Sequence, residues 1–177
     1  MSTRLVILGL LRERPLYGYE IKHIIEDHMG DWTNIAFGSI YFALGKLADE
    51  GFIEKVATEQ KGKRPSRSVY QITEAGRNEF LRLLREVWHE VERHYYTIDI
   101  GLFFKDALPL KEVEGYLRGR VAQMEGVLAY LDGHQAEQLL REETPSQAVL
   151  IFDHARFHFQ AELDWTRGLL HRVEQGD

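Results

Sequence analysis

The chain has 177 residues, 44% of them hydrophobic, with a formal net charge of −6 and no cysteine. This length predicts one medium domain or two small ones, and the missing cysteine excludes disulfides, thiolate metal sites and a cysteine nucleophile. No apolar run reaches the roughly 18 residues that span a bilayer, and the apolar N-terminal stretch lacks the cleavage site of a signal peptide, so we expect a cytoplasmic protein. Residues 1–90 hold 13 basic and 13 acidic side chains, so the acidic surplus lies in residues 91–177.

The hydrophobic pattern predicts three helices in the first 51 residues. They run over residues 3–13, over residues 17–28, and from Ser39 or a residue just before it to residue 50. The third helix has an apolar stripe at helical spacing, made of Ile40, Leu44 and Leu47. Its opposite side is expected to carry Ser39, Phe42, Ala43 and Lys46, with Tyr41 at the edge.

After residue 51 the pattern changes from helical to alternating. Residues 52–59 and 67–73 each predict a strand, and the polar segment between them contains glycine and proline, so we expect a β-hairpin. Four cations gather at its tip, namely Lys61, Lys63, Arg64 and Arg67. Like charges crowded in this way belong either to a solvated loop or to an anion-binding surface.

Three short helices followed by a hairpin is the element order of a winged helix-turn-helix, whose third helix enters the DNA major groove beside the hairpin wing. In this interpretation the hydroxyls of Ser39 and Tyr41 suit phosphate oxygens, and Phe42 suits thymine methyl groups. The wing cations suit phosphates or the adjacent minor groove. Two alternatives stay open: Tyr41 at the edge of the core, and Phe42 packed on the wing.

Three runs of sequence in this region resemble the PadR family of phenolic-acid-responsive regulators and their relatives. They are Y-G-Y-E-I at residues 17–21, S-I-Y-x-A-L-x-x-L-x-x-E-G at residues 39–51 and Y-x-I-T-x-x-G-R at residues 70–77, in matching order and spacing. The resemblance covers residues 3–85, and the second half resembles the long subgroup of the family. One departure is Phe42, where the family commonly has proline, so the specificity of that contact is open.

The resemblance implies a transcriptional regulator, usually a repressor, that binds an inverted repeat of double-stranded DNA as a homodimer. It implies DNA contacts from Tyr19, Ser39, Tyr41, Lys46, Lys63, Arg64 and Arg67. It also implies a small-molecule effector, and only loosely an aromatic one, because family members sense varied ligands.

The second half of the chain is predicted to be entirely helical. One helix starts after Thr73 and breaks near residues 97–101, one follows Pro109 and loosens at residues 132–135, and the last runs over residues 146–174. The first of these carries a heptad seam of Phe80, Leu84, Val87, Val91, Tyr95, Ile98 and Leu102. The seam needs a helix from the same chain or from a second chain, and a dimer is favoured because operators normally offer two half-sites.

These patterns together predict a mainly α protein with a winged helix-turn-helix domain over residues 1–85. A helical dimerisation and candidate effector-binding domain is expected over residues 86–177. We assign dimerisation to Leu84, Val87, Val91, Tyr95, Phe152, Phe159 and Leu163. The candidate ligand pocket comprises Trp88, Tyr96, Phe103 and Trp165. Packing in a dimer core is the favoured interpretation for each of these aromatic residues.

His154 and His158 have the i, i+4 spacing of metal ligands, but such pairs are often ordinary surface or core groups, so no metal or cofactor is assigned. Enzyme motifs such as G-x-S-x-G, the P-loop and H-E-x-x-H are absent, and we expect no enzymatic activity. The rival hypothesis is a winged helix that binds proteins and never touches DNA. Salt separates the two, because phosphate contacts make affinity steeply salt-dependent.

Overall fold

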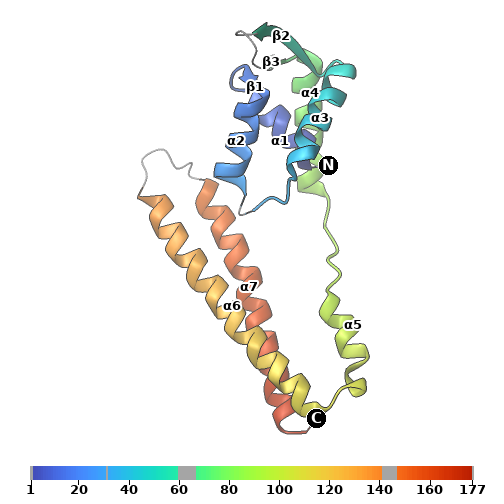
Figure 1. Ribbon diagram of the computed structural model, residues 1–177, viewed down its shortest axis with the longest axis vertical. Coiled ribbons are helices and arrows are strands. Elements are labelled where there is room, and N and C mark those ends of the chain that lie inside the picture. Colours follow the sequence, from blue (N-terminus) through green and yellow to red (C-terminus); the bar gives the residue numbers. More distant parts are fainter. Residues whose placement is uncertain (1, 31, 60–66, 141–146, 177) are drawn as a thin grey trace. The chain divides into compact units, whose positions relative to one another are not determined.

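The computed structural model describes residues 2–30, 32–59, 67–140 and 147–176. The chain divides into two compact units, Met1–Arg93 and His94–Asp177 (Figure 1). Most of the described chain is helical, with one small antiparallel sheet in the first unit, which confirms the predicted fold class. No described helix is both long and apolar enough to cross a membrane.

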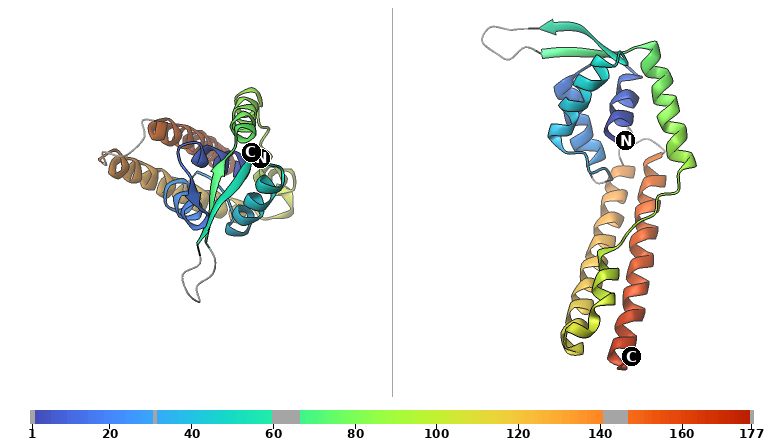
Figure 2. Two further views of the ribbon diagram at one scale, coloured as in Figure 1. Left: turned by 90° about the horizontal axis from the view of Figure 1, so that it is seen from above. Right: turned by 90° about the vertical axis from the view of Figure 1, so that its right-hand side faces the viewer.

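The first unit is a winged helix. Its elements in chain order are α1 (Ser2–Leu11), β1 (Leu16–Tyr17), α2 (Gly18–Met29), α3 (Phe37–Asp49), β2 (Ile53–Glu59), β3 (Arg67–Ile72) and α4 (Glu74–His89). The three strands have the order β1-β3-β2, and both pairs are antiparallel. Figure 2 shows β2 and β3 as a long ribbon at one end of this unit.

One hydrophobic core holds the first unit together, and every helix and strand of the unit contributes to it. Its fully buried side chains include Ile7, Leu8, Leu11, Ile21, Ile40, Leu44, Leu47 and Ile53. The helical residues recur three or four positions apart, so each helix turns one face inward and leaves the other exposed.

The structure corrects three details of the predicted first unit. Strand β1 was not predicted, because two residues are too short to show alternation. The N-cap of α3 is Ala36, so Ser39 lies inside the first turn of the helix. Ala43 is buried in the core, against the prediction that it faces outward, because a residue three positions after Ile40 shares the inward face.

The second unit contains α5 (Thr97–Phe103), a 3-10 turn (Lys105–Ala107), α6 (Leu110–Leu139) and α7 (Gln147–Glu174). Helices α6 and α7 run side by side in opposite directions (Figures 1 and 2). Their shared core is narrow: Met124, Leu128 and Leu163 form one buried cluster with Val121 packed against it, and Leu117, Thr166 and Val173 are also buried. Ion pairs between described residues cross from one helix to the other, among them Arg118–Glu174, Arg120–Glu162, Arg167–Glu125 and Arg156–Asp132.

Two helix predictions in the second half are wrong. The heptad seam is not one continuous helix, because α4 ends at His89 and residues 90–96 are not helical. Acidic residues near the C-terminus of α4 oppose the helix dipole, and the β-branched and aromatic residues that follow are weak helix formers. Conversely, α6 continues through residues 132–135, where the His134 ring stacks on Tyr130 and meets the edge of Phe152 of α7.

Candidate nucleic-acid interface

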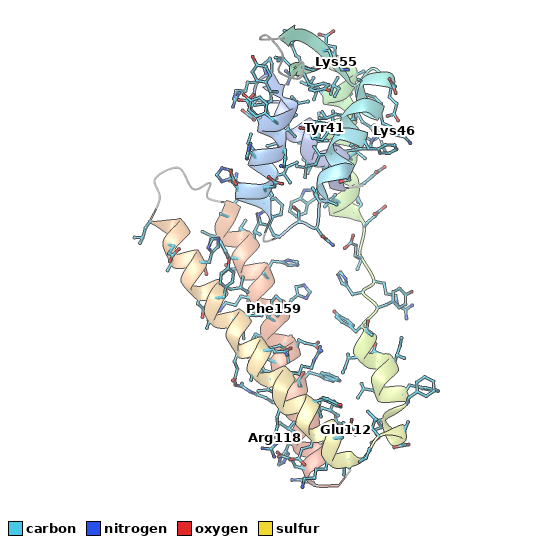
Figure 3. All side chains as sticks on the ribbon, in the orientation of Figure 1. Tyr41, Lys46, Lys55, Glu112, Arg118 and Phe159 are labelled. Atoms are coloured by element: carbon cyan, nitrogen blue, oxygen red, sulfur yellow. The ribbon has the colours of Figure 1, made fainter. Side chains whose placement is uncertain are left out.

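The outer face of α3 presents the side chains expected of a recognition helix. Tyr41 is 44% exposed and Phe42 is 67% exposed, although the opposite side of the helix is buried. The Lys46 ammonium lies 5.4 Å from the centre of the Phe42 ring, within the range of a cation–π interaction. Figure 3 shows Tyr41 and Lys46 on this helix. The face therefore combines aromatic surface with one positive charge.

Ser39 is half-buried near the start of the same helix, and its hydroxyl donates a hydrogen bond to the Ala36 carbonyl at 2.6 Å. A phosphate oxygen can only accept a hydrogen bond, so a phosphate contact from Ser39 requires its hydroxyl to rotate away from Ala36.

Glycine at position 18 allows three elements to meet beneath this face. A Cβ placed on Gly18 would lie 3.3 Å from the Tyr41 ring, 3.5 Å from the Tyr70 ring and 3.6 Å from Leu44. The start of α2 therefore approaches α3 and β3 closely because residue 18 has no side chain. The three sequence runs that carry the family resemblance each supply at least one of these residues, so they meet in space.

The N-terminus of α2 is fixed by its own capping box and presents Tyr19 beside it. The Glu20 carboxylate accepts a hydrogen bond from the Tyr17 backbone N–H at 2.8 Å. The ring of Tyr19, which is 40% exposed, stacks on the ring of Tyr17 with 5.4 Å between ring centres. Tyr19 thus lies at the end of α2 where Gly18 meets α3.

The wing is described up to its tip. Strands β2 and β3 pair from Ile53↔Ile72 to Glu59↔Arg67, with a register shift between Lys55 and Ala57. The predicted contacts Lys61, Lys63 and Arg64 lie outside the described residues. The backbone of Arg67 belongs to β3.

Lys55 is a wing cation that the sequence did not single out. It is exposed on β2, and its ammonium lies 5.9 Å from the centre of the Tyr70 ring (Figure 3). Because Tyr70 also approaches Gly18, Lys55 faces the side of the sheet on which α2 begins. A single lysine in an alternating strand carries no sequence signal beyond its charge.

One joint ties the wing to the helices on either side of it. The Thr73 hydroxyl lies 2.8 Å from the Gly51 carbonyl oxygen and 3.1 Å from that of Phe52, and it accepts a hydrogen bond from the Gly76 N–H at 3.1 Å. Gly51 has a φ of +76°, which glycine adopts without strain. A Cβ on Gly76 would lie 2.0 Å from the Phe52 carbonyl oxygen, so only glycine fits there.

Acidic groups near the end of α3 are paired with arginines. Arg4 lies 2.6 Å from a Glu50 carboxylate oxygen and 3.7 Å from one of Glu79. The hydrogen bond from Arg4 lowers the pKa of Glu50, and that from Arg82 lowers the pKa of Glu79. The paired arginines offset these two negative charges close to where they arise.

The residues assigned to dimerisation have different environments. Leu84 packs against the core of the first unit, and Leu163 is 3% exposed between α6 and α7. Phe152 is half-buried and contacts His134. The others are open to solvent in the single chain: Val87 (52% exposed), Val91 (96%), Tyr95 (82%) and Phe159 (38%).

The aromatic residues of the predicted pocket are also exposed: Trp88 (84%), Tyr96 (49%), Phe103 (82%) and Trp165 (37%). The second unit has a pocket of about 280 Å³ elsewhere, lined by Lys105, Asp106, Leu108, Leu110, Val113 and Gly176. None of the four predicted residues lines this pocket.

The histidine pair on α7 is close together, with 3.2 Å between the Nε2 atoms of His154 and His158. The ring of His94 lies 6.4 Å from that of His158, centre to centre. Within the described ranges, no three histidine, aspartate or glutamate side chains are grouped so that they could hold a metal ion.

Comparison with known proteins identifies the fold and a family that part of the chain resembles. Residues 7–82 match the transcriptional regulator PadR-like family. The negative transcriptional regulator PadR of Bacillus subtilis (strain 168) is 27% identical over 148 residues, which cover 84% of this chain and 81% of that protein.

Solved structures with the same fold align over nearly the whole chain. Bacillus subtilis PadR in complex with operator DNA has a TM-score of 0.79 at 24% identity, covering 98% of this chain and 99% of that one. The same protein in complex with p-coumaric acid has a TM-score of 0.73 at 21% identity, with the same coverage. The Vibrio cholerae virulence activator AphA has a TM-score of 0.72 at 18% identity, covering 99% and 100%. Residues 7–82, which include most of the first unit, are thus similar to the PadR-like family of transcriptional regulators, and the whole chain shares the fold of the solved PadR structures.

Proposed function

We propose that this protein is a sequence-specific DNA-binding repressor that acts in the cytoplasm and has no enzymatic activity. The observation that carries the proposal is the exposed face of α3, where Tyr41, Phe42 and Lys46 stand beside a wing with Lys55 on its strand. A helix of this kind fits the major groove, and the lysines suit phosphates. In the proposed division, residues 1–85 bind DNA and residues 86–177 dimerise and bind the effector.

The direction of regulation follows the curated relative. That relative is a negative regulator and is 27% identical over most of the chain. The activator AphA shares the fold at only 18% identity, so the fold by itself is compatible with either direction. Repression is therefore the better-supported mode.

The proposed DNA contacts are those expected from the sequence, with Lys55 added. They are Tyr19, Ser39, Tyr41, Phe42, Lys46, Lys55, Lys61, Lys63, Arg64 and Arg67. Two copies of the chain would bind the two halves of an inverted repeat, because one recognition helix covers only a few base pairs.

The proposed homodimer is supported by apolar surface on the second unit. Large side chains including Ile100, Phe103, Phe157 and Leu150 are more than 60% exposed in the single chain. Large apolar side chains left in water are typical of a surface that a partner covers. Val87, Val91, Tyr95 and Phe159 are proposed to become buried against the second copy, with Leu84, Phe152 and Leu163 supporting them from within the chain.

An aromatic carboxylic acid is the proposed class of effector, because a relative of this fold was solved with p-coumaric acid. Trp88, Tyr96, Phe103 and Trp165 are the proposed pocket residues. Their rings would become enclosed when the protein dimerises.

The proposal is tested by fluorescence anisotropy with the DNA upstream of the protein's own gene, over a range of salt concentrations and beside a scrambled duplex. We expect selective binding with a steep salt dependence. Each phosphate contact contributes about 0.9 to the slope of log affinity against log salt. Lys46→Gln and Lys55→Gln should therefore each reduce the slope by about 2 for a dimer that makes both contacts twice.

Lys111→Gln is the matched control, because Lys111 is exposed on α6 in the second unit. It should leave the slope unchanged. Equal, salt-insensitive binding to both duplexes would reject the DNA-binding proposal in favour of the protein-interaction module.

A further inference from the structure

The outer face of α3 carries one protruding ring between positions without side chains. Gly38, Phe42 and Gly45 lie on this face, since steps of 100° per residue place them within about 60° of one another. A Cβ on Gly38 or Gly45 would meet no other atom within 4 Å. Phe42, by contrast, is 67% exposed and extends from the middle of the face.

Glycine inside a helix costs about 1 kcal/mol relative to alanine, and two exposed glycines give no packing in return within the chain. They do remove bulk, so the helix backbone can approach a partner more closely on either side of Phe42. In a major groove, this shape would bring the Phe42 ring to the base edges before any neighbouring side chain of the helix.

We propose that Phe42 is a specificity-determining residue that reads the C5 methyl group of a thymine in each half-site. The inference rests on the proposed DNA-binding function. The phenyl ring has no hydrogen-bond donor or acceptor, so it matches the one apolar group that base pairs present in the major groove. Against any other base edge, the ring would desolvate polar atoms without pairing them.

Lys46 helps to position the Phe42 ring and does not itself select the base. Its ammonium lies 5.4 Å from the centre of the Phe42 ring, which restrains the ring on one side. Lys46 is one turn further toward the C-terminus of α3, and base contacts come chiefly from the N-terminal part of a recognition helix. Lys46 therefore contacts a phosphate, which contributes affinity for any sequence.

The experiment replaces thymine by deoxyuridine, which removes the methyl group and keeps every hydrogen-bonding atom. Symmetry-related thymines of the operator are exchanged in pairs, and binding is measured for the wild type and for Phe42→Ala. At one pair of positions the wild type should lose about fourfold in affinity per half-site and about 15-fold for both, the effect of about one buried methyl group each. Phe42→Ala should show no loss at that pair.

Lys46→Gln is the matched control on the same face. It should weaken binding to the thymine and deoxyuridine duplexes equally and keep the 15-fold ratio. Circular dichroism checks that each variant is folded. We expect Phe42→Ala to fold because the side chain of Phe42 is largely exposed. The inference would be overturned, with DNA binding intact, if the affinity of the wild type did not change at any exchanged pair. It would also be overturned if Phe42→Ala kept the wild-type ratio of affinities for the two duplexes. A wild type that binds no DNA would reject the proposed function as well.

Discussion

In the first unit, helices and strands close around one core, whereas in the second unit two long helices share only a narrow seam. The core of the first unit includes side chains from α1, α2, α3, α4 and all three strands. The seam of the second unit has one cluster of three buried residues, a few further buried side chains and ion pairs along its edges. Helix α5, all of which is described, has no buried residue.

This difference indicates how each unit is stabilised. The first unit buries its large apolar side chains within one chain, so its stability should not depend on protein concentration. The second unit leaves many of them in water, and a partner that covers them would add stability by mass action. In this proposal, dimerisation stabilises the folded second unit as well as serving its function.

The strongest test of the self-contained first unit is Gly76→Ala. The new Cβ would lie 2.0 Å from the Phe52 carbonyl oxygen and 2.8 Å from Ile72, and neither the backbone nor the core can move aside freely. We expect a loss of about 3 kcal/mol in the free energy of unfolding, measured by urea denaturation.

The control is Gly45→Ala on the exposed side of α3, where the new Cβ meets no atom within 4 Å. It should increase the free energy of unfolding by up to about 1 kcal/mol. If both variants have similar stability, the close packing at the joint does not limit the fold of the first unit.

The dependence of the second unit on a partner is tested by Phe159→Asp. Phe159 is 38% exposed on α7 (Figure 3), and a charge in an apolar interface would be desolvated without a partner. We expect the dimer dissociation constant to rise by at least about 30-fold in analytical ultracentrifugation. The thermal midpoint of the wild type should rise with protein concentration.

Ala161→Asp adds the same charge at an exposed position of α7, two residues away and on a different side of the helix. It should leave the dissociation constant within about threefold of the wild type, as expected outside an interface hot spot. A wild type that stays monomeric at every concentration would show that the second unit is stable without a second copy.

The smallest expected effect concerns Glu50 and pH. The hydrogen bond from Arg4 lowers the pKa of Glu50 below its ordinary value of 4.5, so the unfolded chain binds this proton more readily than the folded chain. Ionised Glu50 therefore stabilises the fold above about pH 4.5, and this contribution is lost as the pH falls through the lowered pKa. Glu50→Gln should lower the urea midpoint modestly at pH 7, and the difference should shrink at pH 3.

The control uses the other partner. In an Arg4→Gln background, the Glu50→Gln substitution should have a much smaller pH-dependent effect, because the largest cause of the lowered pKa of Glu50 is gone. A difference that persists at low pH would assign the role of Glu50 to packing at the end of α3.

Sequence patterns were sufficient for α1, α2, α3, β2 and β3 of the first unit because each has one buried and one exposed face. They misplaced Ala43, because a small residue gives no apolar signal of its own and only its distance from Ile40 reveals the inward face. They missed β1, because its two residues form a strand only by pairing with β3. In each case a tertiary neighbour decides the outcome.

Patterns in the second half of the chain gave wrong helix boundaries, because apolar spacing does not show where a helix ends. The heptad spacing continues through Val91 and Tyr95, yet the backbone there is not helical, since spacing does not measure helix propensity. The sequence of residues 132–135 suggested a loose segment, but contacts of His134 with Tyr130 and Phe152 accompany a continuous helix. At the interface, charge at the wing tip was visible in the sequence, while the placement of Lys55 on the side of Gly18 needed the folded sheet.

The joint at Thr73 and Gly76 has a consequence for control of transcription. It connects the base of the wing to the end of α3 and the start of α4, so we expect these parts to move together. An effector would gain little by reshaping them. In the proposed dimer it would instead change the distance between the two DNA-binding units. That distance must match the spacing of the two half-sites, which the pitch of the double helix fixes.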